Sequence, residues 1–219
     1  VNAMKILIFS LSLLLISAVS TVSASGEDLM VVDENQTTSV NDTALNLALA
    51  GQPSNVLTSP EEEGLLFMAE EEKLAGDVYS SLNEIWSLRV FDNIGRAERT
   101  HQAAVETLLI RYSLAVPANP PGEFSNETLQ SRYNDLVSRG GLSVEEALRV
   151  GASIEELDIL DLEERMAQTD KEDIQLVYSN LKRGSENHLR AFVNNLERRG
   201  IEYRPEYLSL QEYDGIISG

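Results

Sequence analysis

Cysteine is absent from the 219-residue chain. The fold therefore cannot depend on disulfides, and no thiolate is available to bind a metal ion. Any metal must be held by glutamate, aspartate, histidine and water, a donor set that suits iron, manganese or zinc better than copper(I) or an iron–sulfur cluster. The length allows one good-sized domain with tails, and such a domain buries a core without staples.

Positive charge is also scarce: 17 lysines and arginines accompany 36 aspartates and glutamates, which gives a formal net charge of −19. A surface of this sign repels nucleic acid and anionic membranes, so neither is expected as a partner. The excess of acid is more simply typical of a soluble protein or of a saline habitat.

The chain has one long apolar run, Ile6 to Val19, of about 14 residues, where a membrane-spanning helix needs about 20. The run follows Lys5 and precedes Val22-Ser23-Ala24, small residues typical of a signal peptidase site. The sequence predicts a signal peptide over residues 1–24 that is cleaved rather than kept as an anchor. We therefore expect a secreted or cell-envelope protein with no integral membrane span after cleavage.

Residues 25–58 have no sustained hydrophobic period and are rich in Ser, Thr, Asn and Asp, so the sequence predicts a disordered spacer there. Order is expected to begin at Ser59-Pro60-Glu61-Glu62, because serine at the N-cap and glutamate three residues later form a capping box. Residues 59–219 are predicted to form a helical bundle with a C-terminal tail.

β-type alternation is absent from residues 59–200, where apolar residues recur instead at steps of three and four. Three prolines and a glycine keep residues 116–126 out of any helix, so a long crossover is expected there. The sequence predicts an all-α fold, an antiparallel four-helix bundle whose two helical pairs are joined by this crossover. The expected helices are 59–86, 91–113, a short one on the crossover at 127–138, 143–169 and 170–200.

Only two histidines are present, and both lie on the apolar seam of an expected helix. Glu98 precedes His101 by three residues, so this carboxylate and imidazole share one face of one turn. Buried carboxylates are costly unless they are paired, protonated or bound to a cation. A polar group in the middle of each long seam therefore predicts a metal site inside the bundle. The candidate ligands are Glu71, Glu98, His101, Glu155 or Glu156, and His188.

Helical phase favours Glu71 in the first helix, although Glu70 and Glu72 flank it and a run of glutamates near a helix start is commonly a solvated face. In the third long helix, the heptad neighbours of Glu155 are apolar, which favours it over Glu156. A kink at the preceding glycine, residue 151, leaves Glu156 open.

Asp158, one turn beyond Glu155, is open as a ligand or as a partner of a ligand. The carboxylate-bridged di-iron pattern has one Glu from each of two helices and Glu-x-x-His from each of the other two. This chain matches five of those six positions. At the sixth, Ser185 replaces the glutamate expected three residues before His188. Serine is a poor ligand, so the site is expected to be asymmetric, mononuclear or completed by water.

Four segments, 70–79, 97–101, 154–159 and 180–192, together resemble an uncharacterised ferritin-like family of archaea and bacteria. The resemblance covers roughly residues 60–200 and implies a ferritin-like four-helix fold. It implies no particular reaction. The wider superfamily includes ferritins and rubrerythrins, whose di-iron sites react with oxygen or peroxide, and also members that hold no metal.

The sequence thus predicts an exported, ferritin-like, non-haem protein that binds one or two ions of iron or manganese, with zinc as a further option. As an oxidoreductase it would act on dioxygen, peroxide or ferrous iron. The alternative is an envelope-associated binding or scaffold bundle with a structural metal or a metal-free polar site. Whether the protein is an enzyme, and whether it forms a homodimer, both stay open.

Overall fold

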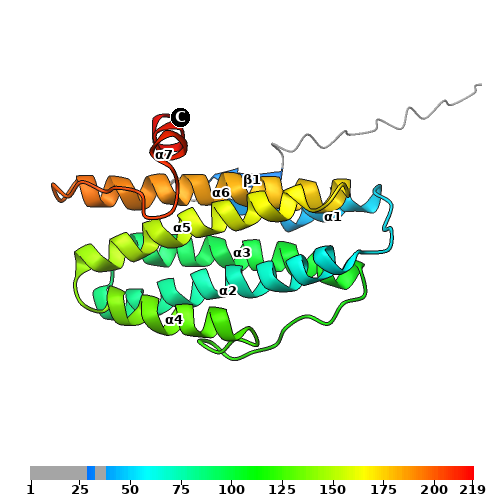
Figure 1. Ribbon diagram of the computed structural model, residues 1–219, viewed down its shortest axis with the longest axis horizontal. Coiled ribbons are helices and arrows are strands. Elements are labelled where there is room, and N and C mark those ends of the chain that lie inside the picture. The colour runs from blue at the N-terminus through cyan, green and yellow to red at the C-terminus, as the bar shows by residue number, and fades with distance from the viewer. Residues whose placement is uncertain (1–28, 33–37) are drawn as a thin grey trace, which may run out of the picture.

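The computed structural model describes residues 29–32 and 38–219, and most of these are helical (Figure 1). The all-α class is confirmed. The expected signal peptide lies outside the described residues. Within the described part, no helix combines the length and the apolar character that crossing a membrane requires.

Four long helices run along the longest axis of the molecule (Figure 1). They are α2 (Ser59–Trp86), α3 (Arg89–Arg111), α5 (Val144–Ala167) and α6 (Glu172–Glu197). Each lies within a few residues of its predicted range. The first begins one residue earlier than its capping chemistry suggested: Thr58 is the N-cap, and its backbone N–H donates to the Glu61 carboxylate over 2.7 Å.

Contacts between α2 and α3 show that the two helices are antiparallel. Gly76 lies against Glu98 and Gly95 lies against Tyr79, so the residue number falls on one helix as it rises on the other. The helices are joined by a two-residue link, residues 87–88. A link this short is typical of two antiparallel helices that pack side by side.

The second pair, α5 and α6, is antiparallel by the same criterion, because Gly151 faces Phe192 and Asp158 faces Ser185. Gly151, where a kink was expected, lies inside α5, which is one continuous helix. A Cβ atom at this position would lie 2.4 Å from the Phe192 ring. Glycine is therefore required there for close packing, and the helix register continues unbroken to the glutamates that follow.

The crossover between the pairs is long, as expected, and carries α4 (Glu127–Gly140). The buried Glu70 carboxylate holds it in place by accepting hydrogen bonds from Asn119 Nδ2 over 2.7 Å and from the backbone N–H groups of Ser125 and Asn126 over 2.7 and 3.0 Å. The C-terminal tail ends in a further helix, α7 (Leu210–Ser218), which the sequence did not predict.

The predicted disordered spacer is wrong for residues 30–32 and 38–50, while residues 51–58 form no helix or strand. Strands β1 (Met30–Val32) and β2 (Thr38–Val40) form an antiparallel hairpin, and α1 (Asp42–Ala50) follows. These elements are too short to show a hydrophobic period, yet they bury apolar side chains against the long helices. The buried residues are Leu29, Val40, Leu45 and Leu49.

The apolar core is divided into two clusters by a layer of buried polar side chains. On α6, Leu181 belongs to one cluster and Phe192 to the other, and Ser185 and His188 lie between them along the helix. The same arrangement is found on α3, where one apolar cluster lies before Glu98 and the other lies after position 101. The polar layer thus crosses the middle of the helical core.

Candidate metal centre

All four long helices contribute to the polar layer, and none of its side chains is more than 5% exposed. Spacing by three residues brings each pair on one helix to the same face. The layer consists of Glu72 from α2, Glu98 and His101 from α3, Glu155 and Asp158 from α5, and Ser185 and His188 from α6.

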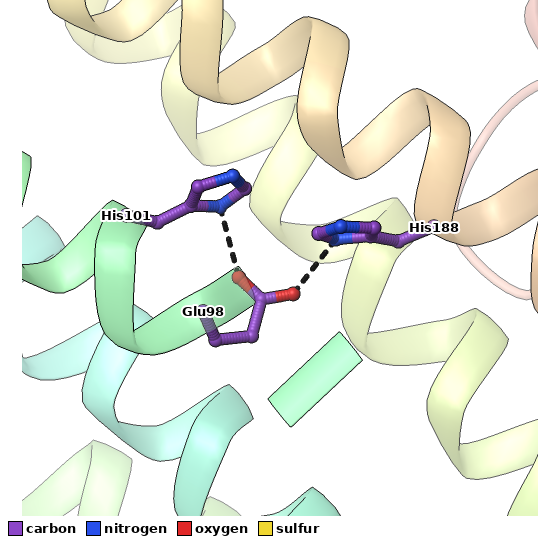
Figure 2. A group of neighbouring side chains, drawn as sticks. All are labelled: Glu98, His101 and His188. Carbon is purple, nitrogen blue, oxygen red and sulfur yellow. Dashed lines mark ion pairs between the residues drawn. The ribbon is translucent and has the colours of Figure 1, made fainter. Parts of the chain in front are cut away.

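Glu98 is the centre of this layer, and Figure 2 shows one of its carboxylate oxygens turned toward each histidine. Oε2 lies 2.9 Å from His101 Nδ1, and Oε1 lies 2.8 Å from His188 Nδ1. The two imidazole rings are stacked, with centroids 5.3 Å apart. A single carboxylate therefore links two histidines that come from different helices.

A further carboxylate lies beside each histidine. Glu72 Oε2 is 3.4 Å from His101 Nδ1, and Glu155 Oε2 is 3.5 Å from His188 Nδ1. Each half of the layer thus has one imidazole nitrogen, one oxygen of Glu98 and one oxygen from a neighbouring helix. Nitrogen and oxygen donors in this combination suit iron, manganese or zinc.

The short contacts at Glu98 do not have hydrogen-bond geometry. His101 Nδ1, His188 Nδ1 and Glu98 Oε1 are buried without any hydrogen-bond partner, despite distances of 2.8 and 2.9 Å between nitrogen and oxygen. Two atoms that each lie about 2.1 Å from one metal ion, at right angles, are about 3 Å apart. These distances suit ligands of a shared cation, and Glu98, His101 and His188 fit a metal ion.

Thr38 fixes the orientation of one of these histidines. Its backbone carbonyl oxygen lies 3.1 Å from His188 Nε2, and the Asn187 side chain donates to its hydroxyl over 2.7 Å. In a neutral imidazole only one nitrogen carries a proton. If the carbonyl keeps that proton on Nε2, Nδ1 has a free lone pair that is directed at the site. Strand β2, from the segment expected to be disordered, thus supports the layer.

The second histidine is held by packing. Any Cβ atom at Gly184 would lie 2.6 and 2.7 Å from two atoms of the His101 ring, so only glycine leaves room for the imidazole. His101 Nε2 is buried and has no hydrogen-bond partner among residues 29–32 and 38–219. The position of the ring therefore depends on its tight contact with the α6 backbone.

The carboxylates of the layer differ in pKa, because burial and the two histidines affect each of them differently. Burial raises the pKa of Glu72 and of Glu155 to about 7. Burial also acts on the pKa of Glu98, but attraction to His188 and His101 outweighs it and holds that pKa below its usual range. In return, Glu98 and Glu155 overcome the effect of burial and raise the pKa of His188 to about 9. A metal ion bound here would therefore displace protons from this layer.

Glu71, predicted as a ligand, is paired with an arginine, and no contact of it with a histidine is found among the described residues. Its Oε1 accepts a hydrogen bond from Arg132 Nη1 of α4 over 2.7 Å, and Glu72 faces His101 instead. Two neighbouring faces of α2 are buried. Leu74 and Val78 are buried on the face that carries Glu71, and Met68 and Tyr79 are buried on the face that carries Glu72.

Glu156 has a different partner from Glu155, although both are buried. Its carboxylate accepts a hydrogen bond from the Tyr203 hydroxyl over 2.6 Å and from the backbone N–H groups of Tyr207 and Leu208 over 2.7 and 2.9 Å. These bonds attach the C-terminal segment to α5. Of the two glutamates, only Glu155 lies beside a histidine.

Glu156→Gln is expected to destabilise the C-terminal segment while leaving metal binding unchanged. The neutral amide accepts fewer and weaker hydrogen bonds, so we expect a loss of about 2 kcal/mol in the free energy of unfolding. Chemical denaturation and protease cleavage after residue 200 measure the loss, and elemental analysis measures the metal. A fall in metal content in the folded variant would mean that Glu156 belongs to the site.

Tyr79 supports the site and was not singled out from the sequence: its hydroxyl donates a hydrogen bond to Glu155 Oε1. Ser185, predicted to be a poor ligand, donates a hydrogen bond through Oγ to Asp158 Oδ2. The position of Tyr79, seven residues after Glu72 on the same face, is a signal available only once the correct seam of α2 is known.

The fold and the site define an all-α protein with a buried cluster of carboxylates and histidines shared by four long helices. The chain belongs to the family described as an uncharacterized protein domain (DUF2202), whose model matches residues 61–219. It is 46% identical over 172 residues to the uncharacterized protein MJ0754 of Methanocaldococcus jannaschii, an alignment that covers 78% of this chain and 93% of the relative.

The crystal structure of MJ0754 is similar to this fold. It aligns with a TM-score of 0.75 at 47% sequence identity, over 76% of this chain and 97% of the crystallised one. The resemblance to an uncharacterised family is therefore confirmed, and the family match runs over residues 61–219.

Proposed function

We propose that this protein is a ferritin-like, non-haem metal protein whose polar layer binds iron or manganese, and that it acts as an oxidoreductase on dioxygen, peroxide or ferrous iron. The observation that carries the proposal is the placement of Glu98 between two buried imidazole nitrogens without hydrogen-bond geometry. In this proposal the ligands are Glu72, Glu98, His101, Glu155 and His188.

Support for the ferritin-like part comes from connectivity. Two antiparallel pairs, α2 with α3 and α5 with α6, are joined by one long crossover, which is the arrangement of ferritin-like bundles. The ligand positions also agree with that class, because every helix of the two pairs supplies at least one of them. Export of the protein is part of the proposal and depends on the apolar run of residues 6–19.

The chemistry divides between metal and protein. When bound, iron or manganese would supply the change of oxidation state that reduction of dioxygen or peroxide requires. The protein fixes the ligands: Thr38 orients His188, and Tyr79 holds Glu155 by a hydrogen bond to the oxygen that faces away from the histidine. The apolar clusters on either side exclude bulk water from the layer.

A surface cavity provides a route for a small oxidant. It has a volume of about 630 Å³ and lies between the start of α3 and the second half of α6, with Thr38 and His188 among its walls. Arg89, Arg190 and Arg198 line it, and no acidic side chain of the described residues does. Because these arginines make the opening positive, although the chain as a whole is acidic, it favours neutral or anionic small molecules over cations.

The test of the proposal is oxygen consumption by protein loaded with ferrous iron in the absence of air. We expect oxygen uptake and an ultraviolet absorption band when air is admitted, and neither in protein loaded with zinc, which has no redox chemistry. Iron-loaded protein that consumes neither oxygen nor peroxide would contradict the oxidoreductase function.

A second candidate is a metal-free scaffold, and one observation favours it. Burial opposes charge on His101, but Glu98 and Glu72 raise its pKa well above the usual value, so protonated histidines can compensate part of the buried negative charge. On this alternative, protein expressed with iron or manganese in the medium contains no metal. On the main proposal, it retains one to two ions per chain.

A further inference from the structure

The polar layer contains one more buried carboxylate, Asp158, which is not among the five proposed ligands. A Glu-x-x-His pattern on α6 would place a carboxylate at position 185, where this chain has serine. Asp158 of α5 approaches that serine from the neighbouring helix: Ser185 Oγ donates a hydrogen bond to Asp158 Oδ2 over 2.5 Å. A carboxylate is therefore present at this point of the layer, but it comes from α5.

The free oxygen of Asp158 belongs to the same layer. Asp158 follows Glu155 by three residues, so both carboxylates lie on one face of α5. Asp158 is 5% exposed, and its Oδ1 atom is buried without a hydrogen-bond partner. Burial and the nearby negative charges of Glu72 and Glu71 oppose its ionisation and raise its pKa.

We propose that Asp158 is the sixth metal-binding side chain, moved from α6 to α5, that Ser185 positions it, and that the completed layer holds two divalent ions. This inference rests on the proposed function. Asp158 Oδ1 is the oxygen left free for a cation, because Ser185 already occupies Oδ2.

Charge balance favours two ions over one. Four carboxylates, Glu72, Glu98, Glu155 and Asp158, compensate two divalent cations, and the two histidines then bind as neutral imidazoles. A single divalent ion would leave two buried negative charges without a partner or would require two carboxylates to stay protonated. Glu98 offers one oxygen to each histidine, so each half of the layer has its own donors.

The test uses manganese(II) as the probe, with elemental analysis for stoichiometry and electron paramagnetic resonance for pairing of the ions. The wild type is expected to bind two manganese ions with a spin-coupled spectrum. Asp158→Asn is expected to bind about one and to show the six-line spectrum of an isolated ion. Asp161→Asn is the matched control, since Asp161 lies on the same helix, 3.8 Å from Arg132 and partly exposed, and should keep two coupled ions.

A rescue variant tests the exchange of positions. Adding Ser185→Glu to Asp158→Asn returns the carboxylate to α6, and we expect the second ion and the coupled spectrum to return. Ser185→Ala keeps the carboxylate but removes its hydrogen-bond donor. For this smaller change we expect the second manganese ion to bind about tenfold more weakly, as is typical when a partner of a ligand is lost. Ser185→Ala also tests the role of Asp158 if the Asp158→Asn variant fails to fold.

Failure of the inference is distinguishable from failure of the proposed function. A wild type that binds no manganese or iron overturns both. A wild type with two coupled ions and an Asp158→Asn variant with the same two overturns only the role of Asp158. A wild type with a single ion, unaffected by Asp158→Asn, leaves the metal protein intact and rejects the two-ion layer. Unchanged affinity in Ser185→Ala rejects the positioning role of Ser185.

Discussion

Glu98→Gln is expected to abolish metal binding, the largest effect of any single substitution in this chain. Among the carboxylates of the described residues, Glu98 is the one that lies within ion-pair distance of both histidines, with one oxygen for each. An amide keeps the size of the side chain but has no negative charge and only one oxygen, so one half of the layer loses its Glu98 oxygen and the other keeps only a neutral, weaker donor. Elemental analysis after loading with iron or manganese measures the loss.

Glu106→Gln is the control for this substitution. Glu106 lies on the same helix, two turns further on, where it accepts a hydrogen bond from Gln102 over 2.7 Å. It should keep the full metal content. Glu98→Gln protein that folds and still binds metal as the wild type does is incompatible with the site described above.

Removal of the metal is expected to lower the unfolding temperature by about 5–10 °C. An ion present at one hundred times its dissociation constant stabilises the native state by about 2.7 kcal/mol. For a domain of this size, each kcal/mol corresponds to about 2–4 °C. Differential scanning calorimetry with and without a chelator measures the shift.

His101→Ala and His188→Ala provide the matched comparison for the thermal experiment. Each removes one imidazole ligand and leaves the surface unchanged, since both histidines are at most 1% exposed. Chelator should shift their unfolding temperatures far less than that of the wild type. If chelation destabilises these variants equally, the stabilising ion is bound elsewhere in the protein.

The long helices were predictable because each buries one continuous face over six or more turns, which gives the sequence a strong period. The pair Glu98 and His101 was predictable for the same reason: α3 has a single apolar face, and both residues interrupt it. On α2 the period is ambiguous, since a second apolar face lies one residue away. This ambiguity led to Glu71, whose carboxylate pairs with Arg132, where the structure has Glu72 beside His101.

The rest of the site depends on contacts between segments that are distant in sequence. Nothing local to Ser185 indicates that Asp158 reaches it from a neighbouring helix, across 27 positions of the chain. Thr38 lies in a three-residue strand, too short to produce a pattern, yet its carbonyl contacts His188. In the sequence, Glu156 resembles a ligand. Its hydrogen-bond donors belong to the C-terminal segment, which reaches it only in the folded chain.

Anomalous diffraction from crystals of iron-loaded protein, recorded on both sides of the iron absorption edge, tests the central claim most directly. We expect two iron peaks in the polar layer, one bound by His101 Nδ1 and one by His188 Nδ1, with an oxygen of Glu98 on each. The contrary result is a layer without an iron peak, in which both imidazoles donate hydrogen bonds directly to Glu98.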